Sequence, residues 1–227
     1  MKEVIRLDNI RRDFVVGDEV VHALRGISLT ITEGEFVTIM GTSGSGKSTL
    51  LNTLGCLDTP TSGEYYLDGI AVRSMDKNAR ATLRNRKIGF VFQNYNLLAK
   101  TTALENVELP LMYNSTYSAA QRRERAEQAL RNVGLGDRML HKSNQMSGGQ
   151  MQRVAIARAL VNRPNVIFAD EPTAELDSNT GLQVMKIFKE LIEKQGVTIV
   201  MTTHDTGLME IADCIYHIED GEIADED

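Results

Sequence analysis

The segment GTSGSGKST, residues 41–49, fits the phosphate-binding pattern G-x-x-x-x-G-K-[ST]. An apolar run at residues 36–40 precedes it and a helix-forming run at residues 48–54 follows it, which predicts a strand, a loop and a helix in that order. In such a loop, backbone N–H groups point inward at phosphate oxygens, and the helix presents the positive end of its dipole. The sequence therefore predicts a nucleoside triphosphate site formed by Gly41, Thr42, Ser43, Gly44, Ser45, Gly46, Lys47, Ser48 and Thr49.

Two side chains of this loop have predicted roles in the chemistry. We expect the Lys47 ammonium to reach the β- and γ-phosphates, and the Ser48 hydroxyl to bind the Mg²⁺ that bridges them. A glycine-rich loop can match the pattern by chance, but a chance match needs neither a strand before it nor a helix after it. The context of the loop therefore favours nucleotide binding.

Length and composition indicate one intracellular domain. The 227 residues are 42% hydrophobic, enough to bury a core without metals or disulfides. Cys56 and Cys214 lie far apart in the sequence without metal-ligand spacing, so we expect reduced thiols. No signal-type segment begins the chain, and no uncharged apolar run approaches the ~18 residues of a membrane span, which predicts a cytoplasmic protein. The net charge of −6 disfavours nucleic acid as a partner.

Alternating strand and helix patterns predict an α/β fold with a doubly wound core. Strands at residues 20–24 and 27–31, together with a hairpin at residues 64–72, predict a small antiparallel sheet beside this core. A helix from Ser118 to Gly134 begins with a capping box and belongs to a helical region. A second helix, from about Ser178 to Lys194, is ended by Gly196. We expect a single domain over residues 1–227, with the core and β subdomain at about 1–92 and 164–227 and a helical subdomain at about 94–163.

A pair of carboxylates follows the apolar strand at residues 166–169. Pro172 cannot donate to a sheet ladder and biases Glu171 toward an extended conformation, so both Asp170 and Glu171 are expected where the strand leaves the sheet. Ligands of open α/β sheets bind at such strand ends. We expect Asp170 to hold Mg²⁺ opposite Ser48, and Glu171 to accept a proton from the water that attacks the γ-phosphate. A solvated acidic turn is the alternative.

Polar residues also end two other apolar runs. Gln93 follows residues 88–92, and His204 follows residues 197–203. Each alone is commonplace in an exposed position after a strand. Their shared placement makes both of them candidate γ-phosphate sensors with catalytic roles. Gln93 is in addition a candidate ligand of Mg²⁺.

A third segment of interest is MSGGQ at residues 146–150, which leads into a helix. Ser147 is a good N-cap, and two glycines allow a close backbone approach to an anion at the helix start. The segment predicts a second phosphate-binding helix terminus, with Ser147, Gly148, Gly149 and Gln150 as its residues.

These motifs, in this order, resemble the nucleotide-binding subunit of an ATP-binding cassette (ABC) transporter from residue 4 to residue 223. The loop at residues 41–49 is similar to the Walker A motif, and Asp170 with Glu171 to the end of Walker B. Gln93 matches the Q-loop and His204 the switch histidine. Ser147 to Gln150 match the family signature, and residues 174–177 match the D-loop, which places Asp177 at the nucleotide. The resemblance also implies an adenine-stacking aromatic, for which Phe14 is the candidate, although a core phenylalanine would look the same.

The resemblance implies an ATPase with a P-loop (RecA-like) core that uses ATP and Mg²⁺. It implies a head-to-tail homodimer formed on ATP binding, with each ATP between Walker A of one subunit and the signature of the other. Residues 88–111 are similar to ATPases of macrolide-export, lipoprotein-release and cell-division complexes, which work with a separate integral membrane permease-type subunit. The chain would then lie on the inner face of the membrane, powering export or extracytoplasmic mechanical work. The alternative is a cell-division-type complex that signals and transports nothing.

Three positions depart from the family pattern: Met146 at the start of the signature, Thr42 in Walker A and Glu175 in the D-loop. The first two are expected to be harmless. Glu175 adds negative charge close to where two subunits would meet, so we expect it to alter dimer affinity or turnover. A GTPase is disfavoured because the guanine-reading N-K-x-D motif is absent from the sequence.

Overall fold

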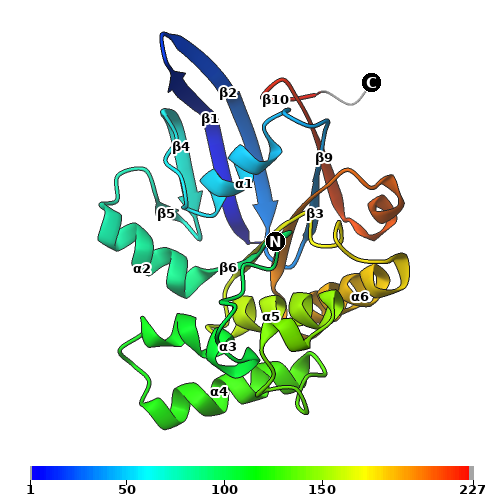
Figure 1. The fold of residues 1–227 in the computed structure, drawn as a ribbon. Helices are drawn as coiled ribbons and strands as arrows, with labels where there is room; N and C mark the ends of the chain where they lie inside the picture. Colours follow the sequence, from blue (N-terminus) through cyan, green and yellow to red (C-terminus); the bar gives the residue numbers. More distant parts are fainter. Residues whose placement is uncertain (1, 225–227) are drawn as a thin grey trace.

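The computed structural model describes residues 2–224 and consists of two sheets with helices around them (Figure 1). The strands of the larger sheet are β3 (Phe36–Met40), β6 (Ile88–Val91), β7 (Val166–Asp170), β8 (Thr198–Thr203), β9 (Cys214–Glu219) and β10 (Glu222–Ile223). Their order is β10-β9-β3-β8-β7-β6, and all neighbours pair in parallel except β9 with β10. The predicted doubly wound α/β core is confirmed.

The smaller sheet is antiparallel and has the order β2-β1-β4-β5. Its strands are β1 (Glu3–Val16), β2 (Glu19–Thr32), β4 (Ser62–Leu67) and β5 (Ile70–Ala71). The predicted hairpin is present as β4 and β5, which pair across the turn at Asp68 and Gly69.

The prediction of two strands at residues 20–24 and 27–31 was wrong, because both belong to the single strand β2. Ile10 pairs with Ile27 and Arg11 pairs with Arg25, so Gly26 is a bulge within a continuous ladder. Its φ of 115° suits a glycine. The sequence signal that looked like a strand break therefore marks a bend in one long strand.

The helices fall on two sides of the larger sheet (Figure 1). The α-helices are α1 (Lys47–Leu54), α2 (Lys77–Lys87), α3 (Ala103–Met112), α4 (Ala119–Asn132), α5 (Gly148–Leu160) and α6 (Ser178–Gln195), with 3₁₀ turns η1 (Ser143–Gln145) and η2 (Thr206–Ile211). Helix α4 begins after Ser118 with the predicted capping box, and α6 ends at Gly196 in the left-handed conformation. Among the described residues, no helix is both long enough and apolar enough to cross a membrane.

The larger sheet is apolar on both faces because each face has its own core. Ile167 and Ala169 of β7 pack with helices α3 to α6, whereas Val166 and Phe168 of the same strand pack with α1 and the smaller sheet. This alternation is the period-2 pattern of a strand that is buried on both sides. The helices at residues 103–160 thus share one core with the sheet, and the subdomain boundaries at about 92–94 and 163–164 stay a prediction.

A buried tyrosine completes the C-terminal end of α1, the helix that follows the phosphate-type loop. Tyr65 of β4 is 1% exposed, and its hydroxyl donates to the Leu54 carbonyl over 2.6 Å. Carbonyls in the last turn of a helix have no partner within the helix, so this bond satisfies one of them. Burial raises the pKa of Tyr65 well above 10, so the hydroxyl stays neutral and keeps donating.

We expect Tyr65→Phe to lower the free energy of unfolding by about 1–2 kcal/mol, because it removes the donor to a buried carbonyl. Urea denaturation followed by circular dichroism measures the change. Tyr113→Phe is the matched control, since Tyr113 is 77% exposed and the substitution should stay within about 0.5 kcal/mol. Equal stability of the two variants would contradict the role of the Tyr65 hydroxyl.

Candidate active site

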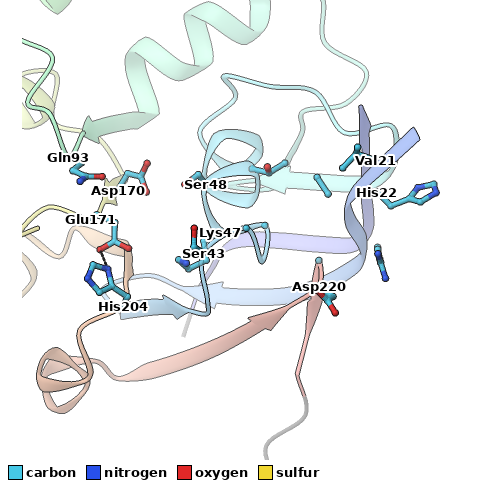
Figure 2. A pocket seen from close by; sticks show the side chains of 16 residues that line it. Val21, His22, Ser43, Lys47, Ser48, Gln93, Asp170, Glu171, His204 and Asp220 are labelled. Carbon is cyan, nitrogen blue, oxygen red and sulfur yellow. Dashed lines mark ion pairs between the residues drawn. The ribbon is translucent and has the colours of Figure 1, made fainter. Parts of the chain in front are cut away.

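A cavity of about 690 Å³ opens at the carboxyl ends of the parallel strands, where β3, β7 and β8 stop (Figure 2). Ligands of open parallel sheets bind at this edge. The residues that line the cavity are Val21, His22, Ala23, Arg25, Ser43, Gly44, Gly46, Lys47, Ser48, Thr49, Gln93, Asp170, Glu171, His204, Asp220 and Gly221. Ten of these were predicted from the sequence as site residues, from Walker A, Gln93, both acids and His204.

The N-terminus of α1 is prepared for an anion. Every other α-helix of the described part of the chain has an N-cap side chain that accepts a backbone hydrogen bond, but α1 has none. Its N-cap is Gly46, in the left-handed region with φ 109°. The N–H groups of a first helical turn lack partners within the helix, so those of α1 are left for a ligand.

The lysine of the loop is folded back on its own backbone. Lys47 Nζ donates to the Gly41 carbonyl over 2.7 Å and to the Thr42 carbonyl over 2.9 Å. On the opposite side, the N–H of Gly221 donates to the Ser45 carbonyl over 2.9 Å. Gly41, Thr42 and Ser45 therefore shape the loop without lining the cavity.

The two acids are held by a threonine of the neighbouring strand. Thr202 of β8 is completely buried and pairs with Asp170, and its hydroxyl donates to Asp170 Oδ1 over 2.7 Å. The N–H of Glu171 donates to both the carbonyl and the hydroxyl of Thr202, at 3.2 and 3.1 Å. Thr202 was not predicted as a site residue, because its only signal in the sequence is a polar residue within an apolar strand.

The expected extended conformation of Glu171 was wrong. Its φ is 45°, in the left-handed region, although Pro172 follows it. The two bonds to Thr202 and a bond of 2.5 Å from Gln152 Nε2 to the Pro172 carbonyl hold the backbone there. A non-glycine residue in this region stores strain of about 1–3 kcal/mol, which surrounding contacts must offset. Both acids still lie at the end of the strand, as expected.

Glu171 and His204 form a pair across the cavity wall. His204 Nδ1 lies 2.9 Å from Glu171 Oε2, drawn as the dashed line in Figure 2. The glutamate is mostly buried, with 17% of its side chain exposed, whereas 71% of the histidine is exposed. The histidine thus contacts Oε2 of the carboxylate and does not engage Oε1.

Gln93 reaches the cavity from the end of β6 and lies near Asp170 (Figure 2). Its Nε2 donates to Glu175 Oε1 over 3.1 Å. Tyr95, two residues further, lies close to the same carboxylate, and desolvation together with the Glu175 charge raises its pKa.

The signature segment lies outside this cavity. Ser147 and Gln150 form a capping box in which each side chain accepts the other's backbone N–H, at 3.3 and 2.9 Å. A Cβ on Gly149 would lie 2.3 Å from Thr180 Cγ2, and one on Gly148 would lie 2.9 Å from the Tyr95 hydroxyl. The close approach that these glycines permit within the chain is therefore to its own side chains. The predicted phosphate contact stays a prediction for a second subunit.

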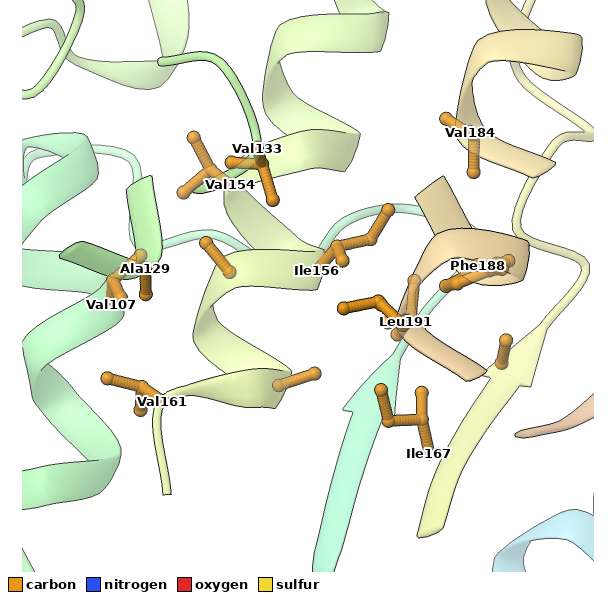
Figure 3. Packing of buried hydrophobic residues seen from close by; sticks show 14 of the residues in the cluster. Val107, Ala129, Val133, Val154, Ile156, Val161, Ile167, Val184, Phe188 and Leu191 are labelled. Atoms are coloured by element: carbon orange, nitrogen blue, oxygen red, sulfur yellow. The ribbon is translucent and has the colours of Figure 1, made fainter. Parts of the chain in front are cut away.

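Helix α5, which carries the signature, is anchored deep in the core. Val154 and Ile156 are fully buried, and Figure 3 shows Ile156 directed toward Phe188 and Leu191 of α6. At the start of α6, Asp177 caps the helix by accepting from the N–H and the hydroxyl of Thr180, and these bonds lower its pKa. Asp177 does not line the cavity.

Phe14 also stands outside the lining of the cavity. It lies on β1 with 36% of its surface exposed, and the Arg12 guanidinium lies 4.3 Å from the centre of its ring. Its partner across the sheet is Val21, which does line the cavity. Adenine stacking by Phe14 stays a prediction.

The outer wall of the cavity was not predicted from the sequence. It consists of Val21, His22, Ala23 and Arg25 of β2 and of Asp220 and Gly221 in the turn between β9 and β10. Arg25 N–H donates to the Gly221 carbonyl over 2.8 Å, which joins the two parts. Contacts between segments almost 200 residues apart leave no local pattern, so no signal in the sequence could have found them.

Comparisons with known proteins agree with this geometry. Residues 24–174 match the family described as ABC transporter. The chain is 49% identical to the uncharacterized ABC transporter ATP-binding protein MJ0796 of Methanocaldococcus jannaschii, covering 99% of this chain and 97% of that protein. It is 52% identical to the macrolide export ATP-binding/permease protein MacB of Syntrophobacter fumaroxidans, covering 99% of this chain but only 32% of that protein. A dimeric, post-hydrolysis structure of the MJ0796 cassette with ADP and Pi superposes with a TM-score of 0.90 at 48% identity, covering 98% of this chain and 97% of that one.

We expect Gly149→Ala to lower the free energy of unfolding by about 1–3 kcal/mol, because the new methyl group would overlap Thr180 Cγ2. Adding Thr180→Ser should recover most of the loss, since serine lacks that methyl group but keeps the hydroxyl that bonds Asp177. Urea unfolding of the single and double variants makes the comparison. A Gly149→Ala protein as stable as the wild type would show that the glycine is not required for this packing.

Proposed function

The chain belongs to the ABC transporter family as an ATP-binding and ATP-hydrolysing subunit, and we propose how its own residues perform the hydrolysis of ATP. The observation that carries the proposal is the uncapped N-terminus of α1 facing two carboxylates across one cavity. The positive helix end and Lys47 suit the phosphates, and the acids suit a cation and a water.

Lys47 would act first, by exchanging its bonds to the Gly41 and Thr42 carbonyls for bonds to phosphate oxygens. The free N–H groups of α1 and of the loop would bind the remaining oxygens. Phe14, whose cross-strand partner Val21 lines the cavity, would stack one face of its ring on the adenine, with Arg12 over the other face of the same ring.

The oxygen donors of the cavity fit Mg²⁺ that arrives with the nucleotide. Ser48, Gln93 and Asp170 offer a hydroxyl, an amide and a carboxylate, which are ligands of the type that Mg²⁺ prefers. Within the described residues, no group of three or more His, Cys, Asp or Glu could hold a metal by itself. That suits a cation held by one carboxylate together with substrate phosphates. When bound, Mg²⁺ would neutralise charge on the β- and γ-phosphates.

Glu171 would accept the proton of the attacking water through the oxygen that His204 does not engage. The water oxygen forms a bond to the γ-phosphorus, the bond from that phosphorus to the β–γ bridging oxygen breaks, and ADP leaves. His204 holds Glu171 in place and keeps its carboxylate directed at the cavity.

The position of the signature supports a shared site between two copies of the chain. Ser147 to Gln150 do not line the cavity that contains Lys47, so they are free to face the nucleotide of another subunit. The structure of the similar MJ0796 cassette is dimeric. We propose that Ser147 and Gly149 contact the γ-phosphate bound by Lys47 of the partner subunit, with Asp177 at the same interface.

We expect Glu171→Gln to bind ATP without hydrolysing it and to accumulate as a dimer, because the amide cannot accept the proton. Static light scattering in Mg-ATP should show twice the mass found without nucleotide. Adding Lys47→Ala should return the mass to that of the monomer, since the phosphates of ATP then lack the ammonium group of Lys47 as a binding partner. A Glu171→Gln protein that stays monomeric in Mg-ATP would contradict the shared site.

A second cavity supports a membrane partner. It measures about 980 Å³ and lies between α2, β6, the end of α3 and α5. We name it the α2–α3 groove; its lining includes Arg84, Arg86, Arg158, Phe90 and Phe92, and no Asp or Glu is among its described lining residues. This chemistry suits a helix end with apolar and acidic side chains.

The groove is linked to the active site by one arginine. Arg158 donates to the Tyr95 carbonyl over 2.8 Å and to the Asn96 carbonyl over 2.6 Å, in the turn that follows Gln93. A partner seated in the groove could therefore shift Gln93. We propose that this partner is a separate permease-type membrane protein, that the chain lies on the inner face of the membrane through it, and that the work is export. The macrolide-export name of one relative supports the last point.

Affinity capture of Glu171→Gln with ATP from detergent-solubilised native membranes should recover a multi-span membrane protein. Tyr113→Glu, which places a charge at the mouth of the groove, should abolish recovery. Leu140→Glu is the matched control, since Leu140 is similarly exposed at 71% but lies outside the groove, and it should leave recovery unchanged. Recovery of only soluble proteins or nucleic acid from an intact membrane fraction would overturn the membrane assignment.

A further inference from the structure

The hydrogen bond between Gln93 and Glu175 joins two segments that are 82 residues apart in the chain. Gln93 follows β6 and lines the nucleotide cavity, while Glu175 lies in the turn between β7 and α6. Glu175 does not line the cavity, so apart from the long-range effect of its charge it acts on the site through another residue. Gln93 Nε2, at 3.1 Å from Glu175 Oε1, is in direct contact with this carboxylate and belongs to a residue that lines the cavity.

The backbones on both sides of this contact are fixed. The turn after Gln93 is held by the two bonds from Arg158, and Tyr95 N–H donates to the Phe92 carbonyl over 3.0 Å. Around Glu175, Ala174 N–H donates to the Glu171 carbonyl over 3.2 Å and Leu176 N–H donates to the Thr173 carbonyl over 3.0 Å. These backbone bonds do not fix the side chain of Gln93, which is flexible and ends in an amide.

The partner decides which way that amide faces. An amide has a donor NH₂ on one side and an acceptor oxygen on the other, and rotation by half a turn exchanges them. A carboxylate only accepts, so Glu175 selects the orientation in which the NH₂ faces it. The oxygen Oε1 is then directed away from Glu175, on the side where Asp170 lies in Figure 2.

We propose that Glu175 is a positioning residue for the cation site: it holds Gln93 with its amide oxygen available to the Mg²⁺ that accompanies the nucleotide. The inference rests on the proposed function of Gln93 as a cation ligand. Hydrogen bonds that orient a metal ligand raise the affinity for the metal, because the ligand no longer has to be ordered on binding.

The test compares the affinity for a fluorescent, non-hydrolysable ATP analogue in Mg²⁺ and in EDTA. The ratio of the dissociation constant in EDTA to that in Mg²⁺ reports how well the bound nucleotide and the protein together hold the cation. The proteins are wild type, Glu175→Ala, Gln93→Ala, the double variant, and Glu193→Ala as a matched control that removes another exposed carboxylate. Glu175 is exposed, so its substitution should not affect folding.

We expect Glu175→Ala to reduce the ratio by about three- to tenfold, the size of one ordinary hydrogen bond. The affinity in EDTA should not change, and Glu193→Ala should behave as the wild type. In the Gln93→Ala background, removal of Glu175 should have no further effect, because its target is gone.

An equal loss with and without Gln93 would overturn the inference, since it would show a simple effect of charge. An unchanged ratio for Glu175→Ala in the presence of Gln93 would do the same while leaving the proposed function intact. Failure of the proposed function would give a different result. In that case Gln93→Ala would show the same ratio as the wild type, or Mg²⁺ would not change the affinity of the wild type for the analogue.

Discussion

The parallel pairing of β7 with β8 is the constraint on which the catalytic end of the molecule depends. Its register places Asp170 opposite Thr202, so one hydroxyl meets both the carboxylate of Asp170 and the N–H of Glu171. The same register directs Ile167 and Phe168 into the two separate cores. A slip by one residue would move both side chains to the wrong face. Core packing and the position of the acids are therefore set by a single choice of register.

Local features of the fold could be predicted because their causes are local. Ser118 with Gln121 determines the start of α4, and Gly196 in the left-handed conformation determines the end of α6. The Walker A loop could be recognised because its glycines, lysine and serine act over a few adjacent residues. Strand ends gave the approximate places of Gln93 and His204, since parallel strands end at one edge of a sheet.

The rest could not be predicted because it depends on which segments meet. Gly26 looked like a break between strands, and only the pairing with β1 shows that it is a bulge. Pro172 gave a reasonable local preference for Glu171, which the bonds to Thr202 overrule. The glycines of the signature suggested an approaching anion, whereas the neighbours that need their space are Thr180 and Tyr95. In each case, a contact distant in sequence outweighed a local tendency.

The bonds from Lys47 to the Gly41 and Thr42 carbonyls bear on the energetics of ligand entry. Through these two carbonyls the ammonium keeps the loop curled around a positive charge. With Lys47 in its proposed role, binding would trade one set of charge-assisted bonds for another, so its net enthalpy would be smaller than the number of new contacts suggests. In return, little conformational entropy is lost, because the loop is already ordered. A loop held in this way is a preorganised receptor, so a nucleotide would enter and leave without the loop having to refold.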